Sequence, residues 1–315
     1  MSMSMESNSK ILCHIQSLIG GRDENQDYAG CLETSVGTVV VVCDGMGALR
    51  GGSTASRIAV TTTLEEISKA KADDNVSKVL ETAVRKANDA VIDAAEADED
   101  LTGMGTTLTA VIINDECATV THLGDSRVYQ LRGRKKVFRT YDHSLVFQSV
   151  RTGLITEEQA RLASNSNVIT KALGISREIE VEISELPYLK GDRFVLCTDG
   201  FWGAMPEKTL LSHISKGNIS TTLEKTALKV DMMGKSQGGH HDNLTVAMLE
   251  VQKESKRKIN MTKKVKCILV SVIILLIASL ALNVYQYKQN HKQSEKPSKT
   301  ENVKGETKVE ETKKL

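Results

Sequence analysis

The chain has 315 residues, of which 40% are hydrophobic and 26% are charged, and its formal net charge is only +1. That balance hides an asymmetry, because residues 1–250 carry 26 Lys and Arg against 34 Asp and Glu, whereas the last 65 residues carry 15 against 6. The net negative charge of residues 1–250 excludes nucleic-acid binding by this part of the chain. Its length allows one sizeable hydrophobic core.

The first ten residues are polar and lack the apolar stretch of a secretory signal. We therefore expect residues 1–10 to be a disordered N-terminus without a cleaved leader. Six cysteines stand at positions 13, 31, 43, 117, 197 and 267. They form no CxxC pair and mostly fall in apolar runs, which predicts reduced core residues instead of a zinc site or a disulfide framework.

Runs of β-branched residues alternate along the chain with helical patterns. Strands are predicted at 37–43, 108–113, 118–123, 128–132, 179–186, 193–197 and 244–251, and helices at 53–70, 75–98 and 221–233. Tight turns, such as the one at Gly133, link some of the strands and favour antiparallel sheets. Periodicity by itself predicts an α+β fold and shows no internal repeat.

Acidic residues recur at the ends of these apolar runs or in glycine-bracketed turns. Asp44 follows Val39–Cys43, Asp199 follows a run ending at Thr198, and Asp125, Asp242 and the earlier Asp27 lie near further turns. Each Asp-Gly pair taken alone is more often a plain turn than a site. Together, carboxylates without nearby Cys ligands or paired His ligands select hard cations, so the pattern predicts a Mg²⁺ or Mn²⁺ site.

At these residues the sequence resembles the metal-dependent serine/threonine protein phosphatases of the type 2C family, in their bacterial form. The resemblance runs from about Ile15 to Val251. It is carried in order by Arg22–Asp27 (RDENQD), Asp44–Gly47 (DGMG), Gly103–Leu108 (GMGTTL), Gly124–Arg127 (GDSR), Asp199–Gly200 and Asp242–Asn243. So many motifs in one order are highly specific.

The resemblance implies a phosphatase domain at 11–251, built as a four-layer α-β-β-α sandwich of two antiparallel sheets. It places two Mn²⁺ or Mg²⁺ ions at one end of the sandwich, and it implies that a hydroxide bridging them attacks phosphorus directly. Asp44 would bridge the two ions, and the Gly45 carbonyl would face the first. Asp199 and Asp242 would complete the shell of the second ion, and Asp27 would hold a metal or a metal-bound water.

Two further roles come from the resemblance, each beside a plainer alternative. Arg22 would pair with the substrate phosphate, since a guanidinium binds two phosphate oxygens at once; otherwise it is an ordinary surface arginine. Asp125, together with Asp199, would hold a third and weaker metal ion; otherwise it is a turn residue that caps the next strand. Asn243 would orient Asp242.

A segment from Asp142 to Gly174 resembles the flap of the bacterial enzymes. Thr156 and Gln159 form a capping-box pattern, so a short helix is predicted to begin there, with Gly153 as a hinge. Four positions differ from relatives: Met46 stands where many eukaryotic members have a histidine, while Ala48, Leu49 and Ser53 depart from the bacterial pattern. With Met46, protonation of the leaving group would fall to a metal-bound water or be less assisted. We expect the other three departures to alter the loop and the helix start without loss of activity.

The C-terminal part has a different composition. A basic linker at 252–266 precedes an apolar stretch, which we interpret as a single transmembrane helix at 267–285; a buried helix is the alternative. The basic linker places the phosphatase domain in the cytoplasm by the positive-inside rule, and the Lys/Glu-rich tail at 286–315 would lie outside the cell, disordered by composition.

The resulting interpretation is a membrane-anchored bacterial enzyme with a monomeric catalytic domain that removes phosphate from phosphoserine and phosphothreonine, opposing a serine/threonine kinase. Its partners would be the kinase, phosphorylated proteins and the membrane, and not nucleic acid. One alternative is a catalytically inactive, membrane-tethered binding module, which would be expected to have lost Asp44, Asp199 or Asp242. Another is a phosphatase of regulator proteins in anti-sigma pathways.

Overall fold

The computed structural model describes residues 2–5, 10–48, 50–163, 165, 168–256 and 274–287. The chain divides into two units, Met1–Lys258 and Ile259–Leu315, which are considered separately. The first unit contains all of the predicted site residues.

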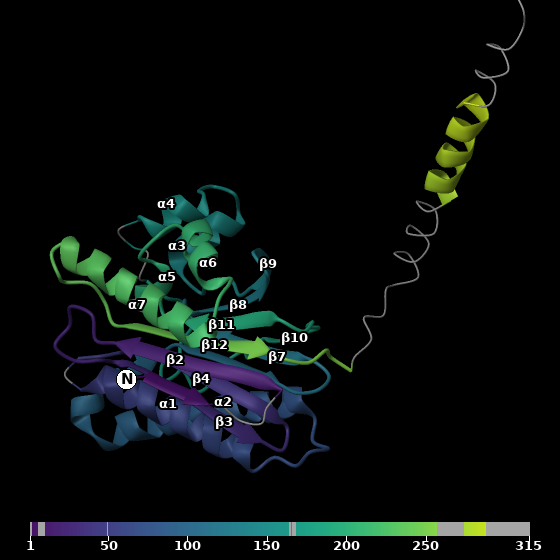
Figure 1. Cartoon of the computed structure of the whole chain (residues 1–315). Helices are drawn as coiled ribbons and strands as arrows, with labels where there is room; N and C mark the ends of the chain where they lie inside the picture. Colours follow the sequence, from purple (N-terminus) through teal and green to yellow (C-terminus); the bar gives the residue numbers. More distant parts are fainter. Residues whose placement is uncertain are drawn as a thin grey trace, which may run out of the picture. The chain divides into compact units, whose positions relative to one another are not determined.

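Two antiparallel sheets form the centre of the first unit (Figure 1). The first sheet has the order β1 (Ser2–Met5), β2 (Ile11–Leu18), β12 (Leu244–Val251), β11 (Asp192–Cys197), β8 (Arg127–Arg132) and β9 (Lys135–Arg139). The second has the order β10 (Ile183–Leu186), β7 (Ala118–Leu123), β6 (Leu108–Ile113), β4 (Gly37–Met46) and β3 (Asp27–Thr34), with the short β5 (Gly105–Thr106) paired to the end of β4.

Helices cover the outer face of each sheet. α1 (Gly51–Ser68) and α2 (Val76–Ala97) pack on the second sheet, while α5 (Asp199–Trp202), α6 (Glu207–Ile214) and α7 (Ile219–Ser236) pack on the first (Figure 1). The flap residues add α3 (Leu145–Arg151) and α4 (Glu157–Arg161), and a 3₁₀ turn spans Glu99–Leu101. The predicted four-layer α-β-β-α sandwich is confirmed.

The run of valines in β4 packs into two different hydrophobic cores. Successive side chains of a strand point to opposite faces. Val39 and Val41 accordingly join the core beneath α1 and α2, while Val40 and Val42 join the core between the two sheets. A strand buried on both faces lacks polar alternation and reads as a continuous apolar run.

Most predicted elements match the structure, with some corrections. β6, β7 and β12 have the predicted bounds, and Thr156 begins α4 with a complete capping box. β2, β3, β9, α3 and α6 were not predicted, and the strand expected to begin at 179 begins at Ile183. The predicted disorder of 1–10 is wrong for residues 2–5, because β1 gains a full set of strand partners along the edge of β2.

Within the second unit, residues 274–287 are helical, and their large apolar side chains are exposed. No helix in the described ranges is both long and apolar enough to cross a membrane. Part of the predicted span, 267–273, and most of the predicted tail, 288–315, lie outside the described residues. The transmembrane helix therefore stays a prediction without support from the structure.

Candidate active site

Strand pairing brings the first two aspartates together. Asp27 opens β3 and lies directly opposite Asp44 near the end of β4. Gly45 then pairs with Thr106 of β5. A side chain at Gly45 would place its Cβ only 1.9 Å from the Gly52 carbonyl oxygen, so only glycine fits at this position of β4.

The other three aspartates arrive from the first sheet. Asp199 starts α5 directly after β11, Asp242 stands two residues before β12, and Asp125 stands two residues before β8. β8, β11 and β12 are neighbours in that sheet, with β11 in the middle. Strand ends of both sheets therefore gather the predicted carboxylates at one end of the sandwich.

A hydrogen bond joins the two sheets within this cluster. The Thr198 hydroxyl, at the end of β11, donates to Asp27 Oδ2 at 2.9 Å, and it accepts from the backbone N–H of Thr245 at 3.0 Å. Thr198 is fully buried. Sequence reasoning missed Thr198, whose only signal is its place between an apolar run and Asp199.

The backbone of Asp44 is held by two adjacent threonines. Thr107 Oγ1 accepts from Asp44 N at 2.9 Å, Thr107 N donates to the Asp44 carbonyl at 2.8 Å, and the Thr106 hydroxyl donates to the same carbonyl at 2.8 Å. Thr107 is in turn hydrogen bonded to Ser126, beside Asp125. These threonines therefore fix the Asp44 backbone.

Electrostatic repulsion links the five carboxylates to one another. Burial, followed by repulsion from neighbouring aspartates, raises the pKa of Asp27 to about 7 and that of Asp199 to about 6. Burial and repulsion from the other four aspartates hold the pKa of Asp44 well above its usual range. The pKa of Asp125 is raised by burial and by Asp199. Positive charge at this site would relieve the repulsion.

These oxygens fit hard divalent cations. Asp27 Oδ1 and Asp199 Oδ1 are buried and lack a hydrogen-bond partner among the described residues. Carboxylate oxygens without sulfur or imidazole ligands suit Mg²⁺ or Mn²⁺. No three His, Cys, Asp or Glu side chains of the described residues are already grouped as ligands of one ion. The metal-ligand assignments of Asp27, Asp44, Gly45, Asp125, Asp199 and Asp242 therefore stay predictions.

Removal of divalent cations makes the stability of this site pH-dependent. Asp27 and Asp199 have a pKa of about 7 and about 6 in the folded chain, against about 3.8 as model groups. Between these values the folded state binds more protons than the unfolded state, so stability rises as the pH falls. In EDTA, we expect the melting temperature to rise as the pH falls from 7 to about 5, and saturating Mn²⁺ to flatten this dependence. An unchanged slope with Mn²⁺ would contradict it.

Arg22 lies at the exposed rim of the cluster. Its guanidinium Nη2 donates to Asp242 Oδ2 at 2.9 Å, and its side chain is 54% exposed. Asp242 Oδ1 also accepts from the Asn243 backbone N–H at 2.8 Å. The structure thus places Arg22 beside Asp242, and this ion pair leaves most of its N–H donors unused. Its role in phosphate binding stays a prediction.

Asn243 fastens the loop that carries Arg22. Its Oδ1 accepts from Gln26 N at 2.8 Å, and its Nδ2 donates to the Ile19 and Glu24 carbonyls at 2.7 and 2.9 Å. The side chain therefore holds residues 19–26, while the backbone N–H of Asn243 is the group that contacts the Asp242 carboxylate. The predicted role of Asn243 in orienting Asp242 thus falls to its backbone.

The histidine that precedes Asp242 supports the same region. His241 Nε2 lies 2.9 Å from Asp231 Oδ1 on α7, and the His241 carbonyl accepts from Gly21 N at 2.9 Å. α7 has a glycine at 234, where a Cβ would lie 2.1 Å from the His241 ring. This contact ties the Asp242 turn and the Arg22 loop to one helix.

The departures at the start of α1 have structural consequences. Ser53 donates to Glu24 Oε1 at 2.6 Å, which links α1 to the Arg22 loop, and Arg50 pairs with Asp98 at 2.9 Å. Ala48 lies exposed, and Leu49 is outside the described residues. The catalytic consequence expected of these positions stays a prediction.

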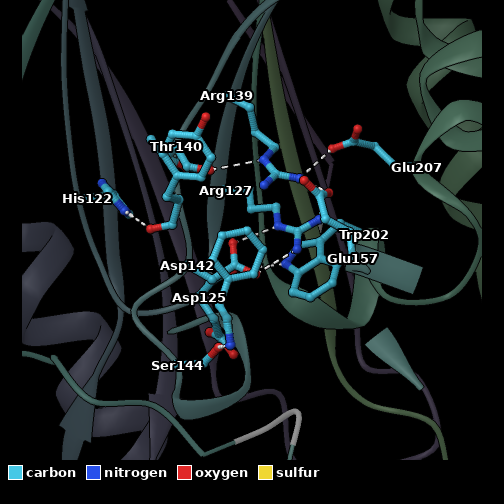
Figure 2. A network of polar contacts seen from close by, with 12 residues as sticks. His122, Asp125, Arg127, Arg139, Thr140, Asp142, Ser144, Glu157, Trp202 and Glu207 are labelled. Atoms are coloured by element: carbon cyan, nitrogen blue, oxygen red, sulfur yellow. Dashed lines mark hydrogen bonds and ion pairs between the residues drawn. The ribbon is translucent and has the colours of Figure 1, made fainter. Parts of the chain in front are cut away.

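The flap is anchored beside Asp125 by a buried arginine. Arg127 makes two hydrogen bonds to the Asp142 carboxylate, at 2.8 and 2.6 Å, and its guanidinium carbon lies 3.3 Å from the centre of the Trp202 ring. Trp202 Nε1 donates to the Asp125 carbonyl at 3.0 Å. Figure 2 shows this chain of contacts, together with Arg139, which reaches Glu157 on α4 and Glu207 on α6. The flap and the Asp125 turn are therefore one connected structure.

A large cavity lies elsewhere in this unit. Its volume is about 1040 Å³, and its lining includes Thr34, Gly37, Asn114, Asp115 and Tyr188. Gly37 begins β4, whereas Asp44 stands near the other end of that strand. None of the clustered aspartates lines this cavity, so its size does not mark the catalytic end.

The sequence and structure match known phosphatases. The family model described as Protein phosphatase 2C matches residues 16–232. The serine/threonine phosphatase stp of Listeria monocytogenes is 34% identical over 73% of this chain and 91% of its own length. The protein phosphatase PhpP of Streptococcus pneumoniae is 31% identical over 74% of this chain and 94% of its own.

Solved structures agree with this fold. The serine/threonine phosphatase PstP/Ppp of Mycobacterium tuberculosis superposes with a TM-score of 0.68 at 28% identity, covering 77% of this chain and 99% of that one. A second structure, the PstP catalytic domain in complex with 2 manganese ions, has a TM-score of 0.65 at 28% identity, covering 77% of this chain and 99% of that one. The chain described here belongs to the protein phosphatase 2C family and is a protein phosphatase.

Proposed function

We propose that this phosphatase hydrolyses phosphoserine and phosphothreonine in proteins. The observation that carries the proposal is the cluster of five aspartates at one end of the sandwich, with Arg22 at its rim. Carboxylates whose pKa is raised by neighbouring carboxylates can bind cations, because positive charge relieves their repulsion. An arginine beside them can bind a phosphate. The relatives named as serine/threonine phosphatases support this substrate class.

Asp27, Asp44, Asp125, Asp199, Asp242 and the Gly45 carbonyl are the groups proposed to hold two Mn²⁺ or Mg²⁺ ions and a third, weaker one. When bound, the ions would supply Lewis-acid chemistry and an activated water. The two orphaned buried oxygens, on Asp27 and Asp199, are the observation that fits this assignment. Thr198, Thr106 and Thr107 would keep these carboxylates oriented.

Arg22 is proposed to bind the substrate phosphate through guanidinium N–H groups that the Asp242 ion pair leaves unused. We expect Arg22→Lys to lower kcat/KM by about tenfold or more, mainly through KM, because an ammonium cannot make the two-pronged contact. Steady-state kinetics on a phosphothreonine peptide would measure this. Arg85→Lys, on α2 where Arg85 contacts Glu81, is the matched control; equal effects from both would contradict the assignment.

The test of the proposed reaction is release of phosphate from a phosphothreonine peptide by the full chain, with Mn²⁺ and with EDTA. Metal-dependent turnover supports the proposal. A folded chain that binds Mn²⁺ but releases no phosphate would favour the inactive binding module instead. Profiling against phosphorylated regulator proteins of anti-sigma pathways would separate that branch from a general serine/threonine phosphatase.

Membrane anchoring at 267–285, with the catalytic domain in the cytoplasm and facing a kinase there, is proposed from the sequence alone. It is supported by the uninterrupted apolar stretch and by the basic linker before it. Anchoring would raise the local concentration near membrane-bound substrates.

Fractionation of cells, followed by protease treatment of right-side-out cells, tests this topology. Membrane retention with trimming of the C-terminal tail supports it. A chain recovered in the soluble fraction, or trimming of the catalytic domain, would overturn it.

A further inference from the structure

The turn that carries Asp242 has a backbone with unusual freedom. It connects α7, which ends at Ser236, to β12, which begins at Leu244. Gly238 and Gly239 within it both have positive φ, at 111° and 78°. Glycine enters this region readily and leaves it as readily, so the turn by itself does not hold one conformation. Asp242 therefore needs a contact from outside the turn to keep its carboxylate in one place.

His241 makes that contact through its side chain. Its Nε2 lies 2.9 Å from Asp231 Oδ1 on α7, ten residues earlier in the chain, and its side chain is only 16% exposed. Lys235 Nζ donates to the other Asp231 oxygen at 2.7 Å. Burial by itself would raise the pKa of Asp231, but the hydrogen bonds from Lys235 and His241 outweigh it and lower that pKa. Asp231 is therefore an ionised acceptor, and the Nε2–H of His241 is the donor.

The helix leaves room for the imidazole at Gly234. A Cβ at this position would lie 2.1 Å from Cγ of His241 and 2.5 Å from its Nδ1. Glycine is a poorer helix residue than alanine, yet here it lets the ring lie directly against the helix backbone. A methyl group at 234 would displace the ring from Asp231.

The same turn holds the loop that carries Arg22. Gly21 N donates to the His241 carbonyl at 2.9 Å, and Arg22 Nη2 donates to Asp242 Oδ2 at 2.9 Å. A Cβ at Gly20 would lie 2.1 Å from the Asp242 carbonyl oxygen, so the two backbones are in direct contact. A displacement of the turn would therefore move the Asp242 carboxylate and the Arg22 loop together.

We propose that His241 is a positioning residue for the metal site, because its hydrogen bond to Asp231 holds the Asp242 carboxylate in the position that binds Mn²⁺. This inference rests on the proposed function, in which Asp242 is a metal ligand. Replacing a side chain that orients a metal ligand typically weakens metal binding by about 10- to 100-fold. His241 thus sets the affinity for the ion through its neighbour, without being a ligand itself.

The experiment titrates the metal-free full chain with Mn²⁺ by calorimetry, without substrate, and measures the melting temperature of each variant in EDTA. His241→Ala removes the donor. His241→Gln is the conservative variant, since its amide N–H can still donate to Asp231. His240→Ala is the matched control, because His240 is the exposed neighbour of the same residue type.

We expect His241→Ala to raise the Kd for Mn²⁺ by about tenfold or more, and His241→Gln to restore most of the affinity. His240→Ala should bind Mn²⁺ as the wild type does. A residue that only stabilised the fold would lower the melting temperature without changing Mn²⁺ binding by the folded protein, and that result would overturn the proposal.

Gly234→Ala tests the same contact from the helix. Its methyl group should displace the imidazole and weaken Mn²⁺ binding as His241→Ala does. The double variant Gly234→Ala/His241→Ala has no ring to displace, so its Mn²⁺ affinity should equal that of His241→Ala alone. Its melting temperature should be higher than that of His241→Ala, because alanine is the better helix residue.

Additive losses of Mn²⁺ affinity in the double variant would contradict the proposed contact, and so would a wild-type chain that binds no Mn²⁺. These binding measurements do not involve phosphate release. A wild-type chain that binds Mn²⁺ through a positioned Asp242 but hydrolyses no phosphopeptide would therefore contradict the proposed function alone.

Discussion

Asp44→Asn is expected to reduce Mn²⁺-dependent phosphate release by about 10³-fold or more, while making the metal-free protein more stable. The first effect follows from its central position, since Asp44 is repelled by Asp27, Asp125, Asp199 and Asp242 together. If Asp44 holds the ions as proposed, its loss would remove several kcal/mol of the charge stabilisation that they would supply, and each 1.4 kcal/mol is about tenfold in rate.

The second effect, a higher stability of the metal-free protein, comes from the same repulsion among the aspartates. In the absence of cations, a carboxylate whose pKa is raised by burial and by like charges opposes folding at neutral pH. Replacing it with the isosteric amide removes that repulsion. The melting temperature in EDTA should therefore rise, and the increase that Mn²⁺ gives to the wild type should be lost or much reduced.

Phosphopeptide kinetics and thermal melting with EDTA or Mn²⁺ measure both effects. Asp93→Asn is the matched control, because Asp93 pairs with Arg177 on the surface and its side chain is 66% exposed. The control should leave activity and the Mn²⁺ response unchanged. An Asp44→Asn protein that kept both activity and the Mn²⁺ response would contradict the assignment of this residue.

Local sequence patterns predict the strands that are apolar and buried along their whole length. β6, with the sequence LTAVII, is buried along its whole length, so its β-branched residues and its bounds both stand out. β2 was missed because His14, Gln16 and Ser17 interrupt its apolar pattern at positions that are nevertheless buried. Ser17 is hydrogen bonded to Thr245 on the neighbouring strand, a partner 228 residues away in the chain.

The same limit applies to the site. Strand-end aspartates could be predicted, since an apolar run followed by Asp-Gly is a local signal. The contacts that orient them could not, because they join distant segments: Thr198 to Asp27 across 171 residues, and Asn243 to Gln26 across 217. Thr198 and Asn243 are also residue types that are common in strands and turns, so the local sequence does not indicate which residue each one contacts.

Arg127→Ala is expected to destabilise the folded chain by about 3–5 kcal/mol, since it leaves the Asp142 carboxylate buried without its partner. The two side chains are 7% and 4% exposed. Arg127 also packs against the Trp202 ring and donates to the Tyr129 hydroxyl at 3.2 Å, so its loss removes packing as well as charge. Denaturant unfolding of the metal-free protein would measure the change.

Two comparisons separate the buried pair from an ordinary ion pair. Arg85→Ala breaks a surface pair with Glu81 and should cost less than about 1 kcal/mol. The double variant Arg127→Met/Asp142→Leu removes both charges, so it should recover much of the loss, because the main cost arises from the orphaned carboxylate. Equal costs for Arg127→Ala and Arg85→Ala would show that the flap anchor carries no special stability. A large loss of unfolding free energy in Arg127→Ala would show that the flap anchor stabilises the fold. Because Trp202, which packs on Arg127, donates to the Asp125 carbonyl, that anchor also contacts the carboxylate cluster.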